Sequence, residues 1–168
     1  SKRVAEILDG PVNDAVTGTR FGLDEAAVAA SNLYASGIKT NDDLGKSLKS
    51  IAGAASMTGS EFSDMAQIFS TVKSNGKLMT MQLNQFSLRG LNLAAELANS
   101  LGKTEAEIRE MVSDGKISYD FLVDATQRFV EQSARANDTY EGALKNVQAA
   151  LGRIGVLVKA NQLEATRK

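Results

Sequence analysis

The chain of 168 residues contains no cysteine and no histidine, and it has a single proline. Without cysteine the protein cannot form a disulfide, use a thiol nucleophile or bind zinc through thiolates. Without histidine it lacks the most common general base and the most common ligand of transition metals. No glycine-rich run ends in Gly-Lys-Ser or Gly-Lys-Thr, so the sequence has no phosphate-binding loop of that type. We therefore expect no enzymatic activity, no catalytic residue, no cofactor or metal site and no small-molecule substrate.

An excess of charge of one sign is also lacking, because 19 lysine and arginine residues are balanced by 20 aspartate and glutamate residues. Proteins dedicated to duplex DNA usually carry a basic stripe, and none is visible in this sequence. No apolar run approaches the roughly 20 residues that cross a bilayer, and none has the form of a signal peptide. We expect neither specific DNA binding nor a transmembrane segment.

The apolar residues are numerous but small. They make up 43% of the chain, while aromatic residues make up only 5%. This content suffices for one folded domain with a thin core. The single proline favours helices over strands. The sequence therefore predicts an all-α fold, in which a cluster of short glycine-capped helices is combined with longer helices.

The short helices are predicted from residues 82–121. Three amphipathic segments there are each closed by a glycine, at Gly90, Gly102 and Gly115. A glycine after a helical run permits the positive φ of a helix C-terminus. Thr104 and Glu107 have the spacing of a capping box, which opens the next helix.

Further helices are predicted from caps and from apolar spacing. Pro11 suits the first turn of a helix that ends near Thr19, and Thr40 and Ser118 suit N-caps. The other expected helices span about 24–36, 41–57, 62–73 and 118–136. The large apolar residues of the central region should pack together: Phe62, Met65, Phe69, Leu83, Phe86, Leu97, Leu101, Ile108, Met111, Phe121, Leu122 and Phe129.

The predicted C-terminal helix carries a short heptad pattern, the seam, formed by Leu144, Val147, Leu151, Ile154 and Val158. Apolar spacings that alternate between three and four residues are typical of coiled coils. The seam is shorter than three heptads, so two interpretations stay open: it packs on the rest of the domain, or it pairs with a copy of itself. We expect an N-terminal helical segment at 1–20, a compact domain at 21–137 and a connector helix at 138–168.

The stretch QLNQFSLRGLNLAAELANSLGKTEAEIREMVSDGKISYDF, from Gln82 to Phe121, resembles the tape measure proteins of long-tailed bacteriophages and prophages. The segment from Thr17 to Met79 is similar to the same family in the same order, as are the motifs Ala136-Asn137-Asp138-Thr139 and Ala149-Ala150-Leu151-Gly152-Arg153-Ile154-Gly155. About 10–155 is covered. The motifs that carry the resemblance contain no catalytic pattern.

The resemblance implies a structural protein that sets the length of the tail tube. By this resemblance the helical protein lies in the tube interior while tube subunits polymerise around it, first in the host cytoplasm and then in the virion, and its partners are tail tube and tail assembly proteins. Because Ser1 is not a natural start and nothing ends the last helix before Lys168, we expect a piece of a longer chain; the alternative is removal of an initiator methionine.

Three other patterns have a functional and a structural interpretation. The acidic group Glu105, Glu107, Glu110 and Asp114 could hold a metal, but helix capping explains it better. The methionines at 57, 65, 79, 81 and 111 are interpreted as core residues. Residues 104–128 could form a helix-turn-helix with 119–128 as the reading helix, although Asp120 and Asp124 would face phosphates poorly. The alternative function is therefore a small helical nucleic-acid-binding or regulatory module.

Overall fold

The computed structural model describes residues 2–132, which belong to one compact unit. This part of the chain is helical and contains no strand, which confirms the all-α prediction for it. The elements in order are α1 (Lys2–Ile7), a π-helix η1 (Leu8–Val12), α2 (Asn13–Val16), α3 (Leu23–Ala35), α4 (Asn41–Thr58), α5 (Phe62–Asn75), α6 (Thr80–Leu88), α7 (Leu93–Leu101), α8 (Glu105–Ser113) and α9 (Tyr119–Thr126).

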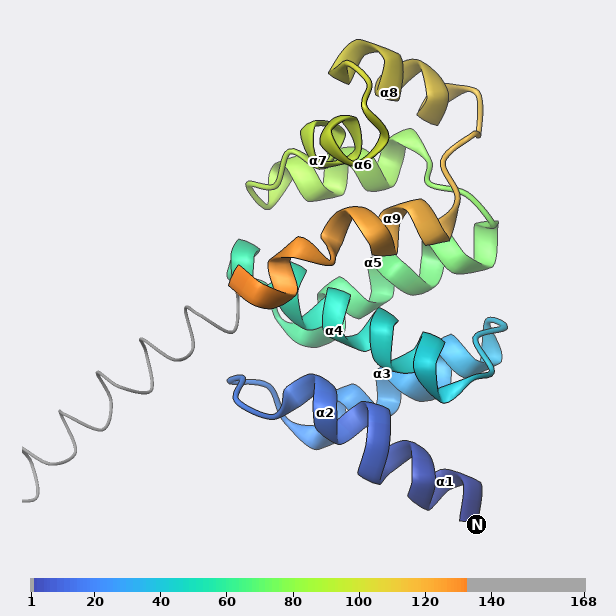
Figure 1. Cartoon of the computed structure of the whole chain (residues 1–168), viewed down its shortest axis with the longest axis vertical. Helices are drawn as coiled ribbons and strands as arrows, with labels where there is room; N and C mark the ends of the chain where they lie inside the picture. The colour runs from blue at the N-terminus through green and yellow to red at the C-terminus, as the bar shows by residue number, and fades with distance from the viewer. Residues whose placement is uncertain (1, 133–168) are drawn as a thin grey trace, which may run out of the picture. The chain divides into compact units, whose positions relative to one another are not determined.

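Two groups of helices flank a central layer (Figure 1). The central layer contains α4, α5 and α9, and α9, which comes much later in the chain, packs against both of the others. Towards the N-terminus, η1 and α2 pack on α4, and α3 packs on both α4 and α5. On the other side, α7 contacts α6, α8 and α9. Residues far apart in the sequence therefore meet at α4 and α9.

The helix caps that the sequence predicts are present. The Thr40 hydroxyl accepts a hydrogen bond from the Asp43 amide at 3.2 Å. In the capping box of α8, the Thr104 hydroxyl accepts from the Glu107 amide at 3.1 Å, and the Glu107 carboxylate accepts from the Thr104 amide at 3.2 Å. Each of these bonds pairs an amide that has no partner inside its helix.

The glycines that end the short helices adopt the left-handed conformation that was expected. The φ angles are +86° at Gly90, +66° at Gly102 and +70° at Gly115. This conformation is unfavourable for residues with a Cβ atom. The chain can therefore reverse sharply between α6, α7, α8 and α9.

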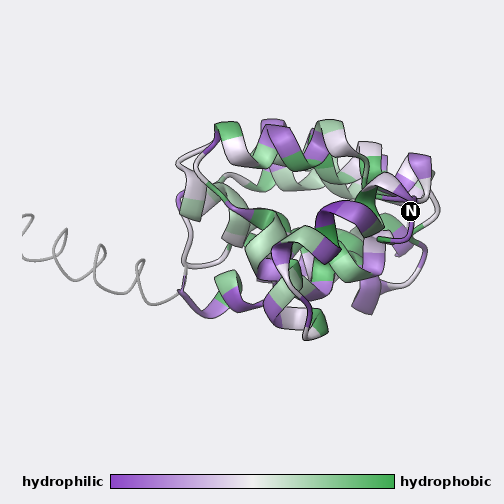
Figure 2. Cartoon of the chain, turned by 90° about the horizontal axis from the view of Figure 1, so that it is seen from above, coloured by the Kyte–Doolittle hydropathy of each residue, from purple (hydrophilic) through white to green (hydrophobic). Residues whose placement is uncertain are grey.

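The core follows the predicted stripe of α5, whose Phe62, Met65 and Phe69 are fully buried. The Phe69 ring meets the ring of Phe86 edge-on, with the centroids 6.1 Å apart. Apolar and polar residues alternate around the helices, as Figure 2 shows. Most of the predicted core residues are buried, while Leu101 and Met111 are only partly buried against the core.

The prediction that Phe121 lies in the core is wrong, because its side chain is 36% exposed. The buried face of α9 carries Leu122 and Ala125, and Phe121 precedes that face by one position. Neighbouring helix positions differ by about 100° in direction, so Phe121 points away from the core.

The structure also differs from the sequence prediction at Pro11. The chain is already helical from Lys2, and Pro11 lies inside η1 and is buried, so it does not open a helix. Proline has no amide hydrogen, and its ring clashes with the preceding turn of an α-helix. A wider π turn accommodates such an interruption.

The helix that follows Ser118 is shorter than predicted. It ends at Thr126, and helical residues resume at 128–132 after a turn at Gln127. The Gln127 side chain donates a hydrogen bond to the Lys46 carbonyl at 3.2 Å and another to the Ser50 hydroxyl. These two hydrogen bonds to α4 stabilise the turn at Gln127.

Candidate functional site

The predicted seam, Leu144, Val147, Leu151, Ile154 and Val158, lies outside the described residues. So does the predicted connector helix at 138–168, and the domain boundaries at 20 and 137 stay predictions. Among residues 2–132, no helix is both long enough and apolar enough to span a membrane.

Two members of the acidic group near α8, Glu105 and Glu107, form hydrogen bonds within the domain. The Thr104 amide and hydroxyl both donate to the Glu107 carboxylate, and these bonds lower its pKa from the usual value of 4.5. The Glu105 carboxylate accepts a bond from the Asn92 side chain at 2.6 Å. No group of three acidic side chains in the described part could hold a metal ion.

The proposed reading helix of a helix-turn-helix is a core element. In α9, Tyr119, Leu122 and Val123 are buried, and the helix packs on α4, α5 and α7. Arg128, the only cation between 119 and 128, forms an ion pair with Glu96. A recognition helix must present one face to the major groove, and α9 has no basic face free to do so.

The interpretation of the methionines is wrong for three of the five. Met65 is fully buried and Met111 partly buried, but Met57, Met79 and Met81 are 47%, 43% and 67% exposed. Met79 and Met81 begin α6, whose buried face is formed by Gln82, Leu83 and Phe86. Single exposed apolar residues are normal on protein surfaces, so they do not define a site.

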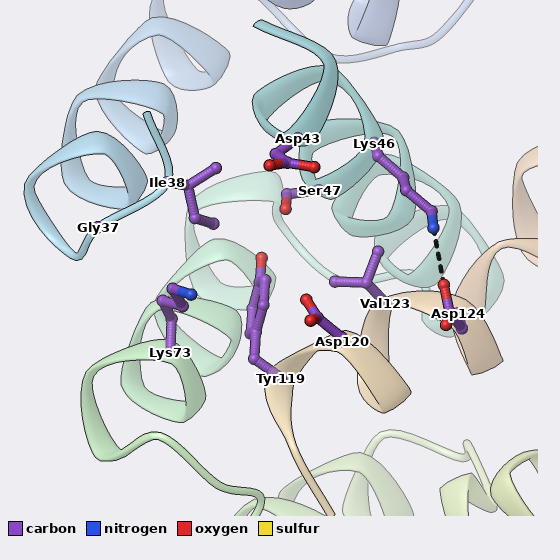
Figure 3. A pocket seen from close by; sticks show the side chains of 10 residues that line it. All are labelled: Gly37, Ile38, Asp43, Lys46, Ser47, Lys73, Tyr119, Asp120, Val123 and Asp124. Carbon is purple, nitrogen blue, oxygen red and sulfur yellow. Dashed lines mark hydrogen bonds and ion pairs between the residues drawn. The ribbon is translucent and has the colours of Figure 1, made fainter. Parts of the chain in front are cut away.

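A polar pocket of about 310 Å³ lies where the α3–α4 loop, α4, α5 and α9 meet (Figure 3). Its buried lining consists of two hydroxyl-bearing residues, Ser47 and Tyr119, and two aliphatic ones, Ile38 and Val123. Its more exposed lining is charged and consists of Asp43, Lys46, Lys73, Asp120 and Asp124, beside Gly37. The pocket thus has a partly apolar floor and a charged rim.

Tyr119 projects its hydroxyl into this pocket, as Figure 3 shows. The Tyr119 hydroxyl is buried and makes no hydrogen bond within residues 2–132. Burial, with a smaller contribution from the Asp120 carboxylate, raises the pKa of Tyr119 to about 12. The Ser47 side chain lowers this pKa, but the Tyr119 hydroxyl has no partner among residues 2–132 at both the distance and the angle of a hydrogen bond.

The Tyr119 ring is fixed on both sides. It meets the Phe69 ring edge-on with the centroids 6.3 Å apart, and the Lys73 ammonium lies 5.5 Å from its centroid. Aromatic pairs of this geometry and cations over a ring are both favourable. The direction of the hydroxyl is therefore set by packing.

The charged rim contains one ion pair. The Lys46 ammonium lies 2.7 Å from the Asp124 carboxylate, and that hydrogen bond raises the pKa of Lys46. Asp43 and Asp120 attract Lys46 at longer range, but within residues 2–132 their carboxylates form no hydrogen bond or ion pair. Because half of each paired side chain is exposed, the pair adds little to stability.

The pocket is not predicted from the sequence. Tyr119 and Asp120 enter the sequence predictions only as parts of a reading helix, and neither Ser47 nor Lys73 is predicted to line a site. The pocket is formed by segments of which the first and the last are more than eighty residues apart, and no short motif links them. The one local signal is the Ser118 cap, whose hydroxyl accepts from the Phe121 amide at 3.4 Å and so fixes the start of α9.

Comparison with known proteins gives one positive finding. A family model described as "Tape measure protein" matches residues 2–157. No curated protein matches the chain. No solved structure matches it either.

Proposed function

The chain belongs to the tape measure protein family, and from that premise we propose that it is a structural domain that takes part in phage tail assembly and in setting tail length. The family consists of structural components of phage tails. The observation that carries the proposal is the family match, which extends over nearly the whole chain. The all-helical fold of residues 2–132 is consistent with it.

Residues 2–132 act in this proposal as a compact module on the ruler and not as the ruler itself. The longest helix of this part, α4, has 18 residues, which correspond to about 27 Å at about 1.5 Å per residue. A continuous helix of residues 2–132 would instead extend about 200 Å. Because the helices fold back on one another, residue count in this part does not convert into length.

The partners in this proposal are tail tube and tail assembly proteins, met in the tube interior of the virion and in the host cytoplasm during assembly. The predicted connector at 138–168 would join the module to the extended part of the protein. Its seam would either pack on the domain or pair with the seam of a second copy. The support for these statements is the family membership and the heptad spacing of the seam.

An in-frame deletion of residues 2–132 in the phage's own gene tests the assembly role. We expect infectious particles with normal tails to be lost, and to return when the intact protein is supplied from a plasmid. Tail length and abundance would be measured by electron microscopy. Normal tails on the deletion phage would contradict a role of this domain in assembly.

A tandem duplication of residues 2–132 tests whether this part is a module or a ruler. The expected tail lengthening is much smaller than about 200 Å, because the added copy folds compactly. The matched control is an insertion of equal length made of continuous helix-forming sequence, which should lengthen the tail by about that amount. Equal lengthening by both insertions would show that this region measures length itself.

A further inference from the structure

Three polar groups that line the pocket could accept hydrogen bonds that no residue among 2–132 donates to them. The Tyr119 hydroxyl is buried, points into the pocket and has no hydrogen-bond partner in the part of the chain that the structure describes. The carboxylates of Asp43 and Asp120 lie at the rim and form no ion pair in this part of the chain. Buried polar atoms are nearly always paired, so an unpaired one aimed into a pocket calls for a partner there, either water or a guest.

Helix stability explains the two carboxylates but not the hydroxyl. Asp43 and Asp120 lie in the first turns of α4 and α9, where the helix dipole favours negative charge. That role leaves the outer lone pairs of each carboxylate free to accept hydrogen bonds. For Tyr119, a phenylalanine would fill the same space between Phe69 and Lys73 without an unpaired oxygen.

The pocket favours a small cationic guest. Its volume of about 310 Å³ is near the lower end of ligand pockets, about 300–1,000 Å³, and suits one long side chain better than a nucleotide. Lys46 is already paired with Asp124, so the unpaired rim charges are two carboxylates against the single ammonium of Lys73. A cation would therefore be attracted and a simple anion repelled.

An arginine side chain fits these features better than a lysine. Its planar guanidinium carries five donors, which is enough for two carboxylates and a hydroxyl oxygen. It is also more weakly hydrated than an ammonium group and enters a half-buried pocket more readily. The aliphatic side chains of Ile38 and Val123 can cover its methylene stem.

We propose that this pocket binds an arginine side chain of a partner protein, whose guanidinium donates hydrogen bonds to Asp43, Asp120 and the Tyr119 hydroxyl. The inference goes beyond the tail role and does not depend on it. The Lys73 ammonium lies 5.5 Å from the centre of the Tyr119 ring and carries the same charge as a guanidinium, so it weakens arginine binding.

A titration of the whole chain with blocked arginine tests the proposal, with binding followed by NMR shifts of the Ser47 and Tyr119 amides. The controls are blocked citrulline, which has nearly the same shape without charge, and blocked glutamate. We expect arginine to bind at least about tenfold more tightly than citrulline, since charge-assisted hydrogen bonds are the stronger ones. Equal binding of arginine and citrulline, or no binding of arginine, would overturn the proposal and leave a pocket that holds only solvent.

Four variants locate the binding. Tyr119→Phe and Asp120→Asn should each weaken arginine binding by about tenfold. Lys73→Met should tighten it, whereas weaker binding in that variant would indicate an anionic guest and overturn the proposal. The matched control is Asp42→Asn, which changes the neighbouring first-turn carboxylate outside this pocket and should leave binding unchanged. A circular dichroism melt of each variant checks that it is folded, and Tyr119→Phe binding as tightly as the wild type would also contradict the proposal.

Discussion

A Cβ atom at Gly53 would lie 2.9 Å from the backbone carbonyl carbon of Phe129. The middle of α4 and the segment that follows α9 therefore touch almost backbone to backbone. Phe129 is buried, and the contact depends on Gly53 having no side chain. This close approach is what lets α9 and the residues after it close the core over α4.

Gly53→Ala should destabilise the protein, although alanine is the better helix former by about 1 kcal/mol. The atoms that the new methyl group would meet belong to the backbone of Phe129 and Val130 and cannot turn away. We expect a net loss of about 1–3 kcal/mol in the free energy of unfolding, measured by urea denaturation. The control is Gly45→Ala in the same helix, where the nearest atom is the Pro11 Cβ at 3.4 Å. A loss of the same size in the control would contradict the explanation.

Thr104→Ala should cost about 1 kcal/mol of stability, because it removes the N-cap of α8.

The pH dependence of stability tests the other half of the capping box, the Glu107 carboxylate. The fold lowers the pKa of Glu107, so its contribution is present above the unfolded value of 4.5 and is lost as the pH falls through the lower folded value. The stability difference between the wild type and Glu107→Gln, followed by thermal melts, should therefore shrink below pH 4.5. A difference that does not change with pH would argue against the capping box.

Phe69→Ala should cost about 3–5 kcal/mol, because its ring is fully buried between Phe86 and Tyr119. Phe121→Ala makes the same chemical change at a side chain that is 36% exposed, and it should cost less, about 1–2 kcal/mol. Chemical denaturation of the two variants side by side gives the comparison. Similar losses in both would place Phe121 in the core after all.

The double change Leu151→Asp and Ile154→Asp tests self-pairing through the seam. If the seam pairs two copies, the wild-type chain should sediment as a dimer at high concentration and the variant as a monomer, since charges at such positions disrupt a coiled coil. Circular dichroism should show that the preceding helices stay folded. A strictly monomeric wild type would rule out self-pairing and leave only packing within the chain.

The features of the fold that depend on neighbouring residues could be predicted from the sequence. The Thr104 capping box and the left-handed glycines after α6, α7 and α8 depend on neighbours within a few residues, so their spacing was enough to predict them. The stripe of α5 was readable too, because a helix with one buried face has a fixed period.

The features that depend on contacts between residues far apart in the chain could not be predicted from the sequence. Pro11 enters a π turn beside Gly45 of α4, and nothing near Pro11 in the sequence records that contact. The pocket beside Tyr119 requires Ile38 and Ser47 to meet α9, and only the folded chain brings them together. The outward direction of Phe121 follows from the same packing of α9.

The pairing of α4 with α9 also bears on how the protein folds during its synthesis. The Ser50 hydroxyl donates to the Val123 carbonyl at 3.2 Å, across more than seventy residues of chain. On the ribosome, α4 is complete long before α9 exists, so part of its apolar surface stays uncovered until the later helix emerges. Contacts that close such long loops form late and slow down folding. A nascent chain stalled before α9 should therefore depend on chaperones that cover exposed apolar surface, and it should become independent of them once residues up to Phe129 have left the exit tunnel.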